Sequence, residues 1–410
     1  MKVNRFAFLM LSILCWVMSI TSCSSTGRGG GGGEGPKPPK PLPKAKVNLY
    51  VENSGSMDGY VKPNHSVFRL SLHAFLNEID SDSVNFESLT VGYINDTIPY
   101  QKPVTSFLDV QDFTTNLTVR SFQHNGGNRT TTTFSNIFDA LLKVTDNKTV
   151  NILVSDFVTD EVPAMMESNI KSVFKKHLNS NTDLAVCVYQ LYSQFDGKYY
   201  YPGASVRSEN INAARPFYIW IIGDVRQVEK LRDFKPQQVV NELVMLKGGK
   251  TVDYAVIKGS GNFKLHTDKI KTKTHVRDLM KDGRTGKASF AIYANLSEFM
   301  LDENYLTNVE NYSISPITYK CKVSVPAKMP QGYSHKIDFE NEKVVAGVMN
   351  VKILMKLPKW VSEKNDDVGT NVHAAMDKTY ALENLIQGTY DAFTENQDFY
   401  TEIKLYINQQ

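Results

Sequence analysis

The residues with the clearest chemical potential lie in one short loop. Residues 52–57 read ENSGSM, so the Glu52 carboxylate and the Ser54 and Ser56 hydroxyls stand at alternate positions. The run VNLYV at 47–51 predicts a buried strand that ends at this loop. Carboxylate and hydroxyl oxygens suit a hard divalent cation such as Mg²⁺. A serine hydroxyl can also act as a nucleophile, so two kinds of chemistry are open.

A catalytic serine would need a histidine and a carboxylate near Ser54 or Ser56. The loop lacks the Gly-x-Ser-x-Gly spacing of a nucleophile elbow. The eight histidines are scattered, with no pair at i, i+4 on one predicted helix. We therefore predict that the protein is not an enzyme. A hydrolase stays as an alternative, because a fold can bring a distant histidine to the loop.

This loop and two later segments together resemble the von Willebrand factor type A (vWA) domain. In that family the first strand ends in Asp-x-Ser-x-Ser, a helix start carries a threonine before Asn-Ile, and a later apolar strand ends in aspartate. Here Ser135 precedes Asn-Ile, and Asp156 follows the run ILVS, in the family's order. The resemblance covers about residues 46–232. It implies a doubly wound sheet with a metal-ion-dependent adhesion site at its carboxyl edge.

The resemblance also implies a role for each side chain. Ser54 and Ser56 would ligate Mg²⁺, Mn²⁺ or Ca²⁺ directly, and Ser135 would do so directly or through water. Glu52 and Asp156 would act mainly through water and hydrogen bonds. Because the direct ligands are neutral, the cation could accept a carboxylate from a partner as its next ligand. That is a mechanism of binding.

Two positions depart from the family pattern. Glu52 stands where the family has aspartate, and its extra methylene displaces the carboxylate further than a metal site tolerates. Either the ion is lost, or Glu52 swings to ligate it directly. Ser135 keeps the hydroxyl of the family's threonine. The threonines at 130–133 are competing hydroxyls if the helix start lies elsewhere than predicted.

Alternating strand and helix patterns predict the fold that must position these residues. Strands are predicted at 47–51, 89–94, 150–154, 184–192 and 217–222, and helices over 68–79, around 137–144, over 166–174 and from Asp224 to Phe234. This order predicts an α/β domain, a doubly wound, mostly parallel sheet of the vWA or Rossmann type with helices on both faces. Asp196-Gly197 predicts a hairpin turn. The tyrosines at 199–201 are either an aromatic contact surface near the metal edge or half-buried strand.

Beyond residue 235 the pattern becomes dominated by strands. They are predicted at 288–293, 317–325, 351–357 and 403–407, with one helix at about 378–393 covering a sheet face. We therefore predict a vWA-like domain over 46–234 and a β-rich domain over 235–410, with a sandwich as the candidate architecture. The second domain carries no chemistry that its sequence identifies.

The N-terminus predicts export and lipid anchoring. Two basic residues precede the run 6–20, which is too short to span a bilayer and fits a signal peptide over 1–22. Ile20-Thr21-Ser22-Cys23 resembles a bacterial lipobox, which implies cleavage before Cys23 and lipid attachment to it. Residues 23–45 contain five consecutive glycines and then five prolines, the composition of a tether.

Charge and cysteine content narrow the functional classes. After residue 46 the chain has 39 basic and 42 acidic side chains, a net charge of −3, which argues against a nucleic-acid partner. Cys15 lies in the signal, and Cys187 and Cys321 lie in predicted strands, so they are interpreted as buried free thiols.

These observations predict a lipid-anchored protein of the bacterial cell envelope that binds a protein or surface ligand offering a carboxylate. Ser24 after the anchor cysteine favours the outer membrane in a Gram-negative host. The alternative is a structural scaffold within an envelope complex, with a vestigial metal site.

Overall fold

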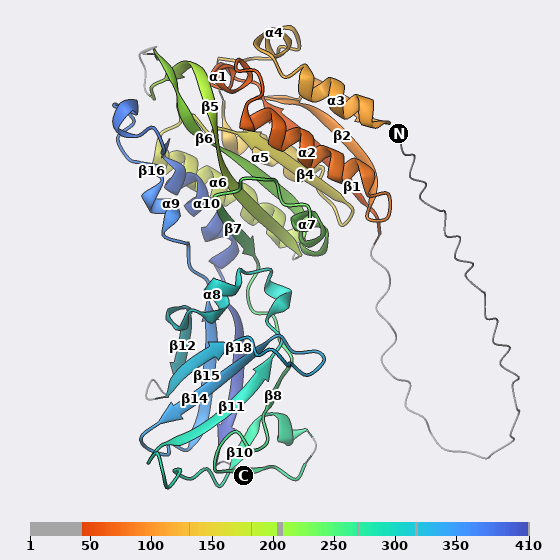
Figure 1. Ribbon diagram of the computed structural model, residues 1–410. Helices are drawn as coiled ribbons and strands as arrows, with labels where there is room; N and C mark the ends of the chain where they lie inside the picture. The colour runs from red at the N-terminus through yellow and green to blue at the C-terminus, as the bar shows by residue number, and fades with distance from the viewer. Residues whose placement is uncertain are drawn as a thin grey trace, which may run out of the picture. The chain divides into compact units, whose positions relative to one another are not determined.

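A seven-stranded sheet forms the N-terminal part of the computed structural model, which describes residues 43–130, 132–181, 183–202, 208–268, 270–315 and 319–408 (Figure 1). The predicted signal, Cys23 and residues 24–42 of the tether lie outside the described residues. Strand order is β3-β2-β1-β4-β6-β5-β7. The strands are β1 Ala45–Glu52, β2 Phe86–Ile94, β3 Tyr100–Val104, β4 Thr149–Ser155, β5 Leu184–Tyr200, β6 Ser208–Asp224 and β7 Asn241–Leu246.

The sheet is mixed. β1 pairs in parallel with β2 and β4, and every other neighbouring pair is antiparallel. Four strands, β1, β2, β4 and β5, therefore run in one direction. The prediction of parallel pairing is confirmed for β2-β1-β4, while the β6-β5-β7 half is a set of antiparallel pairs. The chain is thus an α/β protein.

Helices cover both faces of this sheet (Figure 1). α2 (Val67–Ser81) and α7 (Val225–Arg232) lie on one face, and α5 (Phe134–Lys143) and α6 (Pro163–Ser180) lie on the other. In α2 the predicted apolar stripe is buried, as its helical spacing requires: Phe68, Leu72, Phe75, Leu76 and Ile79. Three shorter helices complete this part: α1 Asp58–Val61, α3 Phe107–Thr115 and α4 Val119–His124.

The predicted turn at Asp196-Gly197 is wrong. Both residues lie inside β5, paired with Asn212 and Ile211 of β6, and the connection runs between Tyr200 and Ser208. A Cβ on Gly197 would lie 2.7 Å from the Cα of Gly59 in α1. Glycine is therefore needed here because two backbones approach each other closely, and not because the chain turns.

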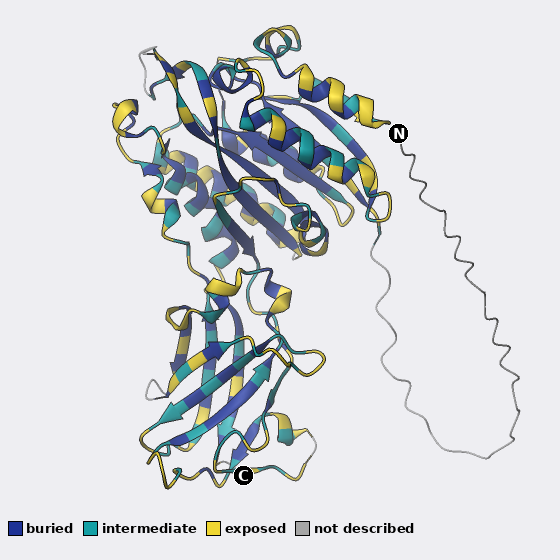
Figure 2. Ribbon diagram, in the orientation of Figure 1, coloured by how far each residue is buried: buried dark blue, intermediate teal, exposed yellow. Residues whose placement is uncertain are grey.

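Two further sheets contain most of the later strands. Their orders are β12-β15-β18-β10-β9 and β13-β14-β11-β8. Buried and less buried residues alternate along β14 and β15 (Figure 2), as in the strands of a sandwich. The strands are β8 Tyr254–Val256, β9 Lys264–Leu265, β10 His275–Arg277, β11 Ala288–Ala294, β12 Tyr312–Ser315, β13 Lys320–Ser324, β14 His335–Asn341, β15 Gly347–Leu354 and β18 Phe399–Ile407. Of the predicted strand 317–325, residues 317 and 318 lie outside the described residues.

Two elements after residue 235 pack with the N-terminal part: one is a strand of its sheet and the other is a helix against one of its helices. β7 pairs with β5, and α10 (Leu382–Thr394) packs against α6. The predicted helix at 378–393 thus covers α6, where Phe393 lies 6.3 Å from Phe174 between ring centroids. Its apolar stripe did not reveal which partner would bury it. The remaining short elements are α8 Glu303–Thr307, α9 Trp360–Glu363, β16 Asn365–Asp366 and β17 Thr379–Tyr380.

The two cysteines among the described residues are both free. Cys187 is buried and Cys321 is half-buried, so the interpretation as unpaired thiols is confirmed. Within the described ranges, no helix is long and apolar enough to cross a membrane.

The contact between α1 and β5 gives a test of the fold. In Gly59→Ala the new methyl group would overlap the ring of Phe195, so we expect the free energy of unfolding to fall by about 1–3 kcal/mol. Gly283→Ala is the control, because nothing lies within 4 Å of a Cβ at that position. Urea unfolding measures both variants. Equal stability of the two would contradict the observed packing.

Candidate functional site

The candidate site lies where the strand order reverses. From β1 the chain proceeds to β2 and β3 on one side, and β4 then pairs with the other side of β1. In open α/β sheets such a switch point leaves a crevice outside the carboxyl ends of the strands. Glu52 is the last residue of β1, and Asp156 follows the last residue of β4. The topology therefore brings the first and third predicted segments together.

A chain of hydrogen bonds joins three of the predicted residues. The hydroxyls of Ser54 and Ser56 are 2.9 Å apart, and Ser56 Oγ donates to Asp156 Oδ1 at 3.0 Å. The same Oδ1 accepts from the backbone N–H of Val158 at 3.1 Å. All three side chains are buried. Either hydroxyl can be the donor in the bond between Ser54 and Ser56, because each has one proton and two acceptor lone pairs.

Glu52 is the fourth member of this cluster. Its carboxylate is fully buried and accepts from Thr132 Oγ1 at 3.0 Å and from the hydroxyl of Ser155. Burial, and then the negative charge of Asp156, raise the pKa of Glu52 to about 7, while hydrogen bonds from Ser155, Ser54 and Thr132 act the other way. Burial also raises the pKa of Asp156. Two carboxylates thus share one poorly solvated space.

Ser135 is the one predicted residue that these contacts do not include. It is the second residue of α5 and is buried, but within the described part of the chain no hydrogen bond joins its side chain to the other four. α5 begins at Phe134, three residues before the predicted start at 137, and Thr132 supplies the hydroxyl that reaches Glu52. Thr132 is one of the four competing threonines at 130–133 in the sequence.

An arginine that the sequence did not single out fastens the loop. Arg129 Nε donates to the carbonyl of Asn53 at 2.6 Å, and its Nη2 donates to the carbonyl of Ser54 at 3.2 Å and to Asp58. Asn53 in turn donates to the carbonyl of Gly126 at 3.0 Å. These bonds hold the backbone of the loop and so fix the serines. No pattern marked Arg129, because it stands in a polar stretch without periodicity.

A second arginine supplies positive charge beside Asp156. Arg215, in β6, is buried, and its Nη1 donates to the carbonyls of Ala375 and Met376 at 3.1 and 3.2 Å. Its charge lowers the pKa of Asp156, against the larger effect of burial. The sequence contained a signal for this residue that the prediction did not use. Burying an arginine next to a wholly apolar strand costs free energy unless a buried group accepts its hydrogen bonds.

The backbone after Asp156 is unusual. Phe157 has a φ of 56°, in the left-handed region that bulky residues rarely adopt. Its buried ring packs 4.7 Å from Phe134 and 5.4 Å from Trp220, measured between ring centroids. The aromatic packing holds this conformation in place and thereby sets the direction of Asp156. Such strained residues concentrate at functional sites.

The aromatic run at 199–201 is mostly interior. The strand interpretation is confirmed for Tyr199, which is buried, and Tyr200, which is half-buried, because both end β5; Tyr201 is buried just beyond the strand. Tyr200 nevertheless lies over the loop, because a Cβ on Gly55 would sit 3.4 Å from its ring.

The donor set of the cluster consists of oxygen atoms: two carboxylates and the hydroxyls of Ser54, Ser56 and Thr132. The described residues contain no group of three or more His, Cys, Asp or Glu placed to hold a metal ion. They also give neither serine a histidine partner, because the hydroxyls bond to each other and to Asp156.

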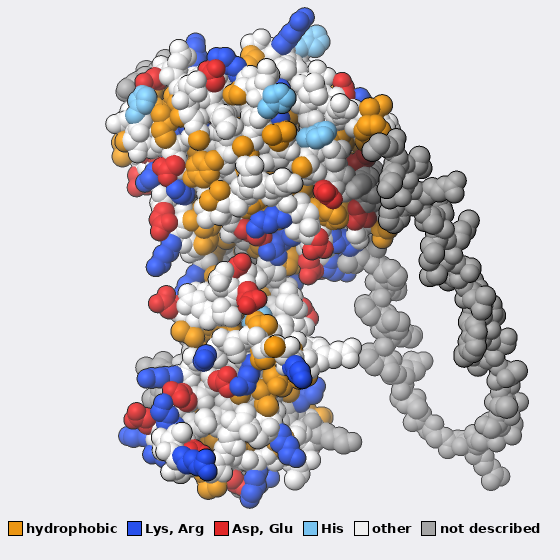
Figure 3. Space-filling model, in the orientation of Figure 1, with side chains coloured by type: hydrophobic (Ala, Val, Ile, Leu, Met, Phe, Trp, Pro, Cys, Tyr) orange, Lys and Arg blue, Asp and Glu red, His pale blue; other side chains and the backbone are white. Residues whose placement is uncertain are grey.

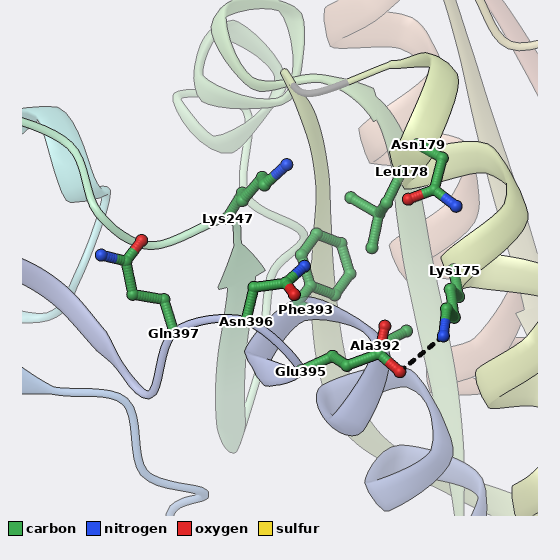
Figure 4. A pocket seen from close by; sticks show the side chains of 9 residues that line it. All are labelled: Lys175, Leu178, Asn179, Lys247, Ala392, Phe393, Glu395, Asn396 and Gln397. Carbon is green, nitrogen blue, oxygen red and sulfur yellow. Dashed lines mark hydrogen bonds and ion pairs between the residues drawn. The ribbon is translucent and has the colours of Figure 1, made fainter.

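A small hollow elsewhere holds none of the predicted residues. It lies between α6, α10 and the end of β7, with a volume of about 30 Å³, and the ion pair Lys175–Glu395 at 2.6 Å borders it (Figure 4). That space admits one or two water molecules. It is too small for a ligand.

Comparisons with protein-family models, with curated proteins and with solved structures give no match for this chain. The resemblance to the vWA domain thus depends on the motifs of the sequence.

The raised pKa of Glu52 predicts how stability depends on pH. Between pH 4.5, the ordinary value, and about 7, the folded state holds a proton that the unfolded chain has lost. Stability without metal should therefore fall as pH rises through this range, by up to about 3 kcal/mol from this group. In Glu52→Gln that loss should disappear.

Urea unfolding in chelator between pH 4.5 and 8 measures this dependence. Glu342→Gln, at an exposed position, is the control and should keep the wild-type slope. A Glu52→Gln variant with an unchanged slope would contradict the assignment of the proton to Glu52.

Proposed function

We propose that the protein is a lipid-anchored bacterial envelope protein that binds a partner's carboxylate through a divalent cation in a vWA-like domain. The observation that carries the proposal is the oxygen cluster of Glu52, Ser54, Ser56 and Asp156 at the carboxyl ends of β1 and β4. The proposed function is binding and not turnover.

The arrangement of strands supports a vWA-like domain. The order β3-β2-β1-β4 is that of the first four strands in a doubly wound sheet, although β3 is antiparallel to β2, and helices cover both faces. The long antiparallel hairpin of β5 and β6 departs from a fully parallel second half. The site depends on the first half only, because both loops that form it follow β1 and β4.

The residues present fit a divalent cation. Burial, and then the negative charge of Asp156, raise the pKa of Glu52, so a bound cation would favour the ionised form of its carboxylate. Ser54 and Ser56 would hold the ion directly, with Thr132 in the role predicted for Ser135, and Glu52 and Asp156 would orient these hydroxyls. When bound, Mg²⁺ offers an electron-poor position for a carboxylate oxygen. The chain's own groups do the rest: they place the hydroxyls and exclude water.

The position of Glu52 favours one of the two outcomes that its extra methylene allows. Its carboxylate is engaged by Thr132 and Ser155 in the interior. This supports an indirect role behind the hydroxyls and not direct ligation. Ser155, the residue before Asp156, thereby connects the two acids.

The scaffold remains the second candidate, on a specific observation. The serines and Asp156 already satisfy one another, and Arg215 provides a fixed positive charge nearby. Such a cluster could persist without an ion and simply hold the loops together. The envelope location in both candidates comes from the sequence of residues 1–24, with Cys23 as the anchor and Ser24 favouring the outer membrane.

A metal titration separates the two candidates. We expect millimolar Mg²⁺ or Mn²⁺ to raise the melting temperature of the full chain, a chelator to reverse the shift, and Ser54→Ala to abolish it, because a ligand of the folded state stabilises it by mass action. Ser193→Ala is the control, since it also removes a buried serine, whose hydroxyl accepts from Phe68 N–H at 3.0 Å. No shift in the wild type would instead support the scaffold.

A second pair of variants tests which hydroxyl serves the site. Thr132→Val removes the donor to Glu52 and should weaken the apparent metal affinity by about tenfold or more, as outer-shell substitutions do. Ser135→Ala should change it much less, because its side chain bonds to none of the other four residues in the described structure. Calorimetry with Mn²⁺ measures both. The reverse order of effects would restore Ser135 as the third hydroxyl.

A further inference from the structure

Exposed apolar side chains lie at the amino end of β1, the end of the sheet opposite the candidate site. Val84, Phe107, Leu108 and Val144 are between 51 and 78% exposed. In the space-filling view, apolar side chains are visible at the outer surface over the start of α3, which Phe107 and Leu108 begin (Figure 3). We call these four residues the apolar edge. Exposed apolar groups that cluster commonly mark a contact surface.

The strand register places all four at the amino end of β1. Ala45 pairs with Phe86, two residues after Val84, and Lys46 pairs with Thr149, five residues after Val144. Val104 pairs with Leu89, so β3 runs back toward the same edge before Phe107 and Leu108. Residues far apart in the sequence therefore share one end of the domain.

Residue 43, the first described residue, also lies at this end, next to the start of β1. Lys44 Nζ donates to the carbonyl of Ser83 at 2.7 Å, next to Val84. About 20 residues separate Pro43 from Cys23. A Gly-rich coil of that length would span on the order of 25 Å and a polyproline II chain roughly 60 Å, so the tether would keep the apolar edge at a high effective concentration near an anchoring membrane.

We propose that the apolar edge contacts the bilayer interface and holds the candidate site pointing away from the membrane. The inference rests on the proposed lipid anchor at Cys23. β1 runs from this edge to Glu52 over eight residues, a rise of about 26 Å. The bilayer is the expected occupant because the unplaced chain begins at this edge and the predicted lipid ends it. A contact of this size is weak alone and depends on the anchor for its occupancy.

Quenching by brominated lipid tests the orientation. The acylated full chain is attached to phosphatidylcholine vesicles with brominated acyl chains, and tryptophan is introduced at one position at a time. Val84→Trp should lose most of its added fluorescence. Val162→Trp is the matched control, because Val162 is an exposed valine as well, with 58% of its surface accessible. It lies at the start of α6, after β4, at the end of the sheet that carries the candidate site. It should keep its fluorescence. The chain without an added tryptophan gives the background of Trp220 and Trp360, because the predicted cleavage before Cys23 removes Trp16.

A third variant tests whether the apolar edge inserts into the bilayer or whether the introduced tryptophan inserts by itself. In Val84→Trp combined with Phe107→Ser and Leu108→Ser, quenching should be largely lost while the protein still floats with the vesicles. Equal quenching at positions 84 and 162, or quenching that survives the two serines, would overturn the proposed contact and leave the anchor standing. A chain that does not float with the vesicles would overturn both the anchor and the contact.

Discussion

The structure of the site depends on the burial of two carboxylates at the ends of neighbouring parallel strands. Burial makes both Glu52 and Asp156 harder to ionise, and the charge of Asp156 adds to this effect on Glu52. Hydrogen bonds from neighbouring groups offset the free-energy cost of burying these charges. Thr132 and Ser155 donate to Glu52, and Ser56 and a backbone N–H donate to Asp156. Arg215 adds the one full positive charge identified beside Asp156 in the described structure. The loop geometry follows from that arrangement, because each serine must face an acid to satisfy it.

The same constraint explains the strained backbone at Phe157. β4 must end so that Ser155 faces Glu52 and Asp156 faces Ser56, although successive residues in a strand point to opposite sides. A left-handed residue immediately after Asp156 ends the strand abruptly and releases the chain into the crevice. The aromatic packing of Phe157 against Phe134 and Trp220 offsets the conformational cost. The core thereby supports the site directly.

Much of this could be predicted from local pattern. The hydrophobic residues of α2, β1 and β4 predict these elements, and two of the three short motifs located four of the five site residues that come together. Thr132 was only one of four equivalent threonines, since a single residue's shift in the helix start decides which hydroxyl faces Glu52. Arg129 and Arg215 act through contacts 71 to 161 residues away in sequence, which no local pattern records. Gly197 was misread because a glycine at a turn and a glycine at a close contact look alike until the neighbour is known.

The packing of α10 against α6 has a consequence for the order in which the protein is made. The side of α6 that includes Phe174, Glu167 and Lys175 is covered by residues of α10, which are synthesised some 200 positions later. Until the ribosome has nearly finished, this surface lacks the cover of α10 and is open to chaperones. A nonsense mutation that removes only the last thirty or so residues would therefore damage the N-terminal sheet, far from the missing segment in sequence.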